Sequence, residues 1–76
     1  MYKIKNILLV DMLRNGDFEE GQIMNVLFHG DKVATFQVKE CDGDQYLIDL
    51  QDNEEVACSY LTAYGFEFEI TNQILK

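Results

Sequence analysis

The sequence predicts a small α+β domain in which one N-terminal helix packs on a curled four- to five-stranded antiparallel sheet. Near the N-terminus, apolar residues recur every three to four positions, as they do on one face of a helix. From residue 22 onward they alternate with polar residues, and short turn sequences separate the alternating stretches. The chain has 76 residues, of which 47% are apolar and none is proline, so we expect a single domain over residues 1–76.

The helix is expected over residues 4–14. One broad apolar stripe contains Ile4, Leu8 and Met12 at four-residue spacing with Ile7 beside them, and a second row contains Leu9 and Leu13. Asn15-Gly16 is a typical left-handed helix end, and Arg14 complements the negative end of the helix dipole. A strand over residues 6–10 is the alternative interpretation.

Period-two alternation predicts the strands. QIMNVLF and KVATFQVK read as a hairpin, followed by QYLIDL, by a short strand around residues 55–58 and by FEFEI after a crossing over residues 59–65. In QYLIDL, the side chains of Tyr46, Ile48 and Leu50 would share one face. Turns are expected at His29-Gly30, Asp42-Gly43 and Asp52-Asn53, because these residues tolerate the conformations that tight turns require.

The strands are expected to pair in sequential order, as a meander with the helix on its apolar face or across its open end. Their inward-facing residues and the helix stripe should form one contiguous core, which contains Ile7, Leu8, Phe36, Val38, Ile48, Phe66 and Phe68.

Charge is distributed unevenly along the chain, whose formal net charge is −8. Residues 1–16 hold three bases against one acid, whereas residues 17–76 hold thirteen acids against three lysines. This field would repel bare nucleic acid and an anionic membrane but attract a basic protein surface. The apolar run at residues 7–10 is interrupted by Asp11 and Arg14, far short of a signal peptide or a spanning helix, so we expect a cytoplasmic protein.

The residues needed for catalysis or metal binding are scarce. His29 is the one histidine and is expected in a turn, so neither a nucleophile–base pair nor a zinc quartet can be assembled. Cys41 and Cys58 are expected to be free thiols, one or both of them buried. The five glycines are isolated, and the Asp42–Asp44 stretch lacks the rest of a calcium loop. We therefore expect a non-enzymatic protein with no cofactor, no metal and no catalytic residue.

Acidic residues are the strongest candidates for a functional site. Residues 40–55 contain seven carboxylates and no lysine or arginine. Carboxylates that alternate along a strand lie about 6.6 Å apart and can follow the basic contacts of a nucleic-acid-binding protein. The partner-binding candidates, called the acidic cluster below, are Asp42, Asp44, Asp49, Asp52, Glu54, Glu55, Glu67 and Glu69. The alternative is that these acids only keep a small sheet soluble.

Two resemblances extend this interpretation. The stretch GDKVATFQVKECDGDQYLIDLQDNEEV resembles the central three strands of an SH3-like or Tudor barrel. Tudor domains that bind methylated lysine or arginine use an aromatic cage, which that resemblance would place on Tyr46, Tyr60, Tyr64 and Phe66. Core packing is the favoured role for these rings.

Almost the whole chain is similar to short accessory proteins of phages and prophages of Gram-positive bacteria. The similarity lies in an N-terminal helix closing on RNG, a hairpin through HG, the DNEEV connection and SYLTAYGFEFEI. It implies a small accessory protein expressed from a mobile element in the host cytoplasm, a class that includes anti-defence proteins and anti-CRISPRs. The leading hypothesis is an inhibitor that mimics nucleic acid and occupies a basic site on a host protein. The alternative is an assembly module that forms homo-oligomers through a strand edge or a helix face.

The last strand allows a direct test of its two faces. We predict that Phe68→Ala lowers the free energy of unfolding by about 3–5 kcal/mol, because a large core side chain is lost. Glu69→Ala, on the other face, should have little effect. Thermal melts of the two variants check this, and the reverse ranking would show that the faces are assigned backwards.

Overall fold

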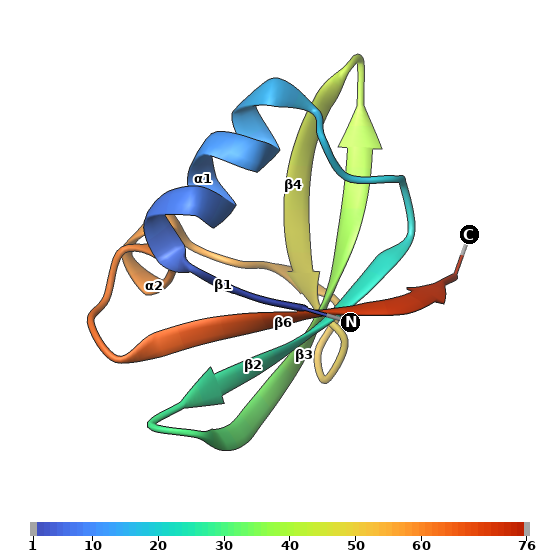
Figure 1. The fold of residues 1–76 in the computed structure, drawn as a ribbon. Helices are drawn as coiled ribbons and strands as arrows, with labels where there is room; N and C mark the ends of the chain where they lie inside the picture. The colour runs from blue at the N-terminus through green and yellow to red at the C-terminus, as the bar shows by residue number, and fades with distance from the viewer. Residues whose placement is uncertain (1, 76) are drawn as a thin grey trace.

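The computed structural model describes residues 2–75, without the side chains of Cys58 and Tyr60. It confirms a small α+β domain with a helix on an antiparallel sheet (Figure 1). The elements are β1 (Tyr2–Lys5), α1 (Asn6–Asn15), β2 (Gln22–Phe28), β3 (Asp31–Cys41), β4 (Asp44–Asp49), β5 (Glu54–Glu55), α2 (Cys58–Leu61) and β6 (Phe66–Ile74). The sequence did not predict β1 as a strand or α2 as a helical turn.

The sheet in residues 2–75 has six strands, more than the four or five expected, in the order β1-β6-β2-β3-β4-β5. The expectation of sequential pairing is therefore confirmed from β2 to β5 and wrong for β6, which was expected beside β5. β6, the last strand of the chain, lies between β1 and β2 and pairs antiparallel with both. Alternation tells which face of a strand is buried but not which strand is its neighbour. The strand with the cleanest alternation takes an interior position, and lysine-bearing β1 takes an edge.

Helix α1 ends where the sequence predicted. Gly16 has φ 69° and ψ 34°, the left-handed conformation that glycine adopts without steric cost. Its N–H donates to the carbonyl of Leu13, and the next N–H, of Asp17, donates to the carbonyl of Met12. The start differs from the prediction, because residues 2–5 pair with β6 and the helix begins at Asn6.

The most buried positions of α1 belong to the second apolar row, and of the predicted stripe within α1 only Met12 packs, partly buried, against the core. Leu9 is fully buried and Leu13 is 9% exposed, whereas Ile7 is 76% and Leu8 is 49% exposed. Ile4 is buried, but as part of β1. Once Ile4 belongs to a strand, the stripe loses its first member and the two rows are nearly equal in apolar content. The direction in which the chain leaves β1 then decides which row meets the sheet.

The predicted turns are present. His29 and Gly30 both have positive φ, as do Asp42 and Gly43, which is the pattern of two-residue hairpin turns. Asn53 also has positive φ, between β4 and β5.

The turn at residues 42–43 fixes the register of β4, and this register reverses the face that was expected. Leu47 lies opposite Val38 and is buried, while Ile48 lies opposite Gln37 and is half-buried. Three apolar residues on the other face of β4 made that face the stronger candidate. The pairing with β3 outweighs this local count.

The core assembles around β6 and β3. Phe68 and Val38 are fully buried, and Phe36 is 1% exposed. Phe66 is partly buried and packs against the same cluster. The predicted core was therefore correct for the two longest strands and wrong for α1 and β4.

The end of β6 is fixed to the start of β2. The Leu75 N–H donates to the Gly21 carbonyl at 2.8 Å, and the Gly21 N–H donates to the Val38 carbonyl at 2.8 Å. The side-chain amide of Gln37, the one buried polar residue in the described chain, donates to the Leu75 carbonyl. Thr71 Oγ1 donates to the carbonyl of Ile23 at 2.8 Å. Backbone and side-chain bonds thus hold this end of the sheet together.

The helix assignment leads to a prediction. Leu9→Ala should lower the free energy of unfolding by about 2–5 kcal/mol, because it removes a fully buried side chain. Ile7→Ala should change it by less than about 0.5 kcal/mol, since Ile7 is exposed. Urea denaturation checks both variants. A larger loss for Ile7→Ala would mean that the helix packs through its other face.

Gly21 provides a second prediction. It has φ +91°, and a Cβ atom there would collide with the Leu75 carbonyl, whereas Gly43 has φ +87° and open space around it. Gly43→Ala should cost about 1–2 kcal/mol for its backbone conformation, and Gly21→Ala should cost clearly more. Removal of residues 75–76 should abolish the additional cost of Gly21→Ala over Gly43→Ala. Equal costs for the two alanines in the full chain would contradict the close contact.

Candidate functional site

The acidic cluster falls into three separate places in the structure. Asp42 and Asp44 lie at the β3–β4 turn, and both are exposed. Asp49, Asp52, Glu54 and Glu55 lie around the β4–β5 turn. Glu67 and Glu69 lie on β6. The first two groups occupy opposite ends of β4, whose six residues span about 17 Å.

Among the acids of the β4–β5 turn, Asp52, Glu54 and Glu55 are exposed and Asp49 is half-buried, and two of the four have local structural roles. Asp49 Oδ1 accepts the N–H of Gln51 at 2.9 Å, and Asp52 Oδ1 accepts the N–H of Glu54 at 3.0 Å. Such bonds stabilise a turn through its own backbone. Glu54 is exposed, and its backbone lies opposite Asp49 in the short pairing between β4 and β5. All four acids line a shallow cavity of ≈ 340 Å³ together with Phe36 and Val56.

Glu67 and Glu69 differ from the other acids because bases lie next to them. On neighbouring β1, Lys5 lies opposite Glu67 and Lys3 lies opposite Glu69. Opposite charges at such positions attract across the strands. Asn25 Nδ2 also donates to Glu69 Oε1 at 2.9 Å. These two acids therefore contribute less to an uncompensated negative surface than the two turn groups do.

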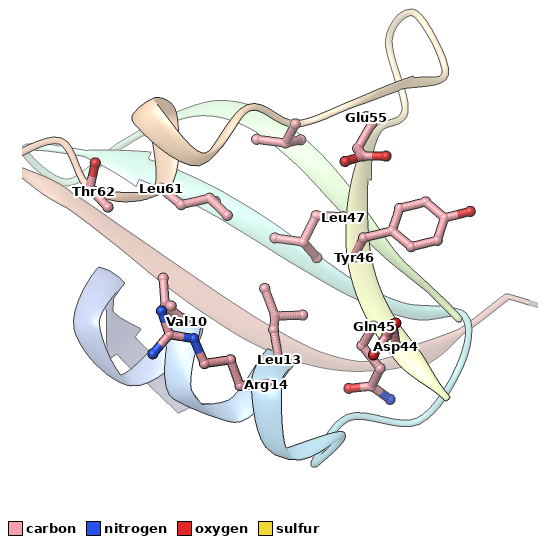
Figure 2. A pocket seen from close by; sticks show the side chains of 11 residues that line it. Val10, Leu13, Arg14, Asp44, Gln45, Tyr46, Leu47, Glu55, Leu61 and Thr62 are labelled. Atoms are coloured by element: carbon pink, nitrogen blue, oxygen red, sulfur yellow. The ribbon is translucent and has the colours of Figure 1, made fainter. Parts of the chain in front are cut away.

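A cavity that the sequence did not predict lies between α1, β4 and α2. Its volume is ≈ 440 Å³, and we call it the α1–β4 cavity (Figure 2). The residues that line it are Val10, Leu13, Arg14, Asp44, Gln45, Tyr46, Leu47, Glu55, Val56, Leu61 and Thr62. Figure 2 shows Leu13, Leu47 and Leu61 pointing toward its centre, with Tyr46 pointing away.

The α1–β4 cavity has an apolar interior and a charged rim. Leu47 and Leu61 are buried, whereas Arg14, Asp44 and Glu55 are exposed. Gln45 is held in place, since its side-chain oxygen accepts the Phe18 N–H and its nitrogen donates to the Phe18 carbonyl. No sequence motif marks this site, because its residues come from four segments. The available signal was the second apolar row of the helix, which includes Leu13.

The structure does not assemble the rings suggested by the Tudor resemblance into a cage among the residues it describes. Tyr46 lies opposite Lys39 on β3, and Phe66 packs on Phe28 with ring centroids 4.8 Å apart, at the other end of the sheet. Tyr64 is 96% exposed, so the packing role expected for its ring is wrong. The side chain of Tyr60 lies outside the described residues.

Other candidate positions have simple structural surroundings. His29 lies in the β2–β3 turn, with its ring at 4.2 Å from that of Phe28. Cys41 is a free thiol, as expected, and is exposed; the side chain of Cys58 lies outside the described residues, so the expected burial of one thiol stays a prediction. In the described residues, no group of three or more His, Cys, Asp or Glu side chains could hold a metal ion. Neither described helix is long and apolar enough to cross a membrane.

Comparison of the chain with protein-family models, with curated proteins and with solved structures gave no match.

Proposed function

We propose that this chain is a non-enzymatic, acidic protein-binding module that competes with nucleic acid for a basic site on its partner. The observation that carries the proposal is the pair of exposed acidic turns at opposite ends of β4, in a segment, residues 40–55, without any base. Their separation of about 17 Å equals about five phosphates of one DNA strand, at roughly 3.4 Å per charge. A channel that binds a nucleic-acid backbone would meet negative charge over a comparable length.

The resemblance to phage accessory proteins supports a particular setting for this activity. In that setting the partner is a host defence protein and the site of action is the host cytoplasm. Inhibition requires no chemistry from the chain itself, since occupation of the basic channel excludes the nucleic acid. The acids supply long-range attraction, which acts mainly on the rate of association.

A second function is favoured by a different surface. β1 lies at one edge of the sheet, and about half or more of the side chain is exposed for Tyr2 on β1 and for Ile7 and Leu8 on the helix that follows it. An assembly module would bury this surface against a second copy of the chain. Such an oligomer would form without a partner and would be insensitive to salt, which distinguishes it from the first function.

The first function predicts an effect of charge at defined positions. Asp42, Asp44, Asp52, Glu54 and Glu55 are replaced by their amides, which changes the net charge from −8 to −3. Association with a short polylysine should slow markedly at low salt, and its salt dependence should flatten. Stopped-flow measurements at two salt concentrations check this.

A matched control changes the same number of exposed acids elsewhere, namely Asp11, Asp17, Glu19, Glu20 and Asp31. The net charge of this control is also −3, which leaves only the position of the acids different. If position matters, the control should slow association less than the first variant does. Equal slowing would show that net charge alone is responsible. An on-rate indifferent to salt and to both variants would rule out the nucleic-acid mimic.

A further inference from the structure

The α1–β4 cavity opens beside a stretch of β4 that has no partner strand in the described chain. β5 pairs with Ile48 and Asp49, and Val56 N–H then donates to the Leu47 carbonyl at 2.9 Å. Beyond that bond, residues 44–46 pair with β3 on one side and with no described strand on the other. An open strand edge of this kind can accept another extended chain.

The register shows which backbone groups face the open edge. In a two-residue hairpin the residues that flank the turn, here Cys41 and Asp44, exchange hydrogen bonds with each other. The next residue, Gln45, is therefore a non-hydrogen-bonded position, and its N–H and C=O point away from β3. The Val56–Leu47 bond follows the same alternation two residues later. Gln45 thus offers one donor and one acceptor to an incoming strand.

The side chains around this edge differ in character on its two faces. Gln45 and Leu47 lie on the cavity face, whose interior is formed by apolar residues of α1, β4 and α2. Asp44 and Tyr46 alternate with them on the opposite face, and Glu55 lies opposite Ile48 on that face. A strand paired with residues 44–46 would therefore place one side chain in the cavity and its two neighbours near Asp44 and Tyr46.

We propose that this edge binds an extended segment of the basic partner with the pattern basic–apolar–basic. The apolar side chain enters the α1–β4 cavity, and the backbone of that residue pairs with Gln45. One basic side chain pairs with the Asp44 carboxylate. The other makes a cation–π contact with the Tyr46 ring and lies close to Glu55. This inference rests on the proposed function, because it specifies how a basic partner is recognised.

Charge argues against a second copy of the chain as the occupant. Self-pairing at this edge would bring Asp44 and Glu55 of one copy toward the same acids of the other, and like charges across paired strands are destabilising. The chain as a whole carries −8, so the repulsion extends beyond the edge itself. A cationic segment gains from the same field.

The test uses the full chain and an end-capped peptide, Thr-Arg-Leu-Lys-Thr. Two control peptides keep its charge: one replaces leucine by serine, and one carries an N-methyl group on leucine, which removes the donor to the Gln45 carbonyl. We expect each control to bind at least about tenfold more weakly. We also expect the Gln45 amide to exchange more slowly with solvent when the leucine peptide is bound, as measured by NMR.

Two protein variants test the position of the site. Thr62→Trp places a large ring at the cavity from an exposed position and should weaken the binding of the leucine peptide by about tenfold or more. Asn72→Trp adds the same ring at an exposed position on β6, which lines none of the cavities described above, and should leave binding unchanged. Retained folding of both variants is checked by their amide spectra.

The outcomes separate this inference from the function on which it rests. Equal, salt-dependent binding of all three peptides would overturn the strand-and-cavity mode while leaving the acidic module in place. If, without peptide, the Gln45 amide exchanges more slowly as the protein concentration rises, the edge pairs with a second copy of the chain and the inference is overturned. If no peptide binds at low salt while polylysine association still depends on the turn acids, the inference fails alone. If polylysine association does not depend on the turn acids either, both the inference and the proposed function fail.

Discussion

The fold depends on β6 being paired on both sides. β6 lies between the first strand of the chain and the β2–β3 hairpin, and its Phe68 is fully buried. Without it, β1 would have no partner strand among the described residues, since β1 pairs with β6. The exposed and buried rows of α1, the position of the cavity and the charge pairs on β1 all follow from this placement.

The same placement divides the acidic residues into two kinds. Glu67 and Glu69 belong to a strand whose neighbour carries Lys3 and Lys5, so their charge is matched locally. The acids around β4 lie far from this edge, at the other side of the sheet order. Residues 40–55, on the β3–β4 hairpin and its extension, therefore concentrate seven acids without a base beside an apolar cavity. In the proposed function, the charge attracts a partner from a distance, while the cavity and the strand edge select among partners at contact.

Local chemistry explains which features the sequence predicted. Positive-φ turns at residues 29–30 and 42–43 and the helix end at Gly16 were predictable, because each depends on one or two residues. The faces of β3 and β6 were predictable from alternation. The buried face of α1 and of β4 was not, because each has apolar residues on both sides and the choice depends on strand pairing. The α1–β4 cavity could not be predicted at all, since it forms between segments brought together by the long-range position of β6.

The position of β6 also bears on how the protein is made. A ribosome adds about 5–20 residues per second and releases the N-terminal segments first. Among the described strands β1 and β2 emerge early, yet the strand that joins them follows all the others in the sequence. The inner edges of β1 and β2 therefore remain open until β6 has been synthesised. Closure of the sheet, and with it burial of Leu9 and Phe68, must wait until β6 has left the exit tunnel.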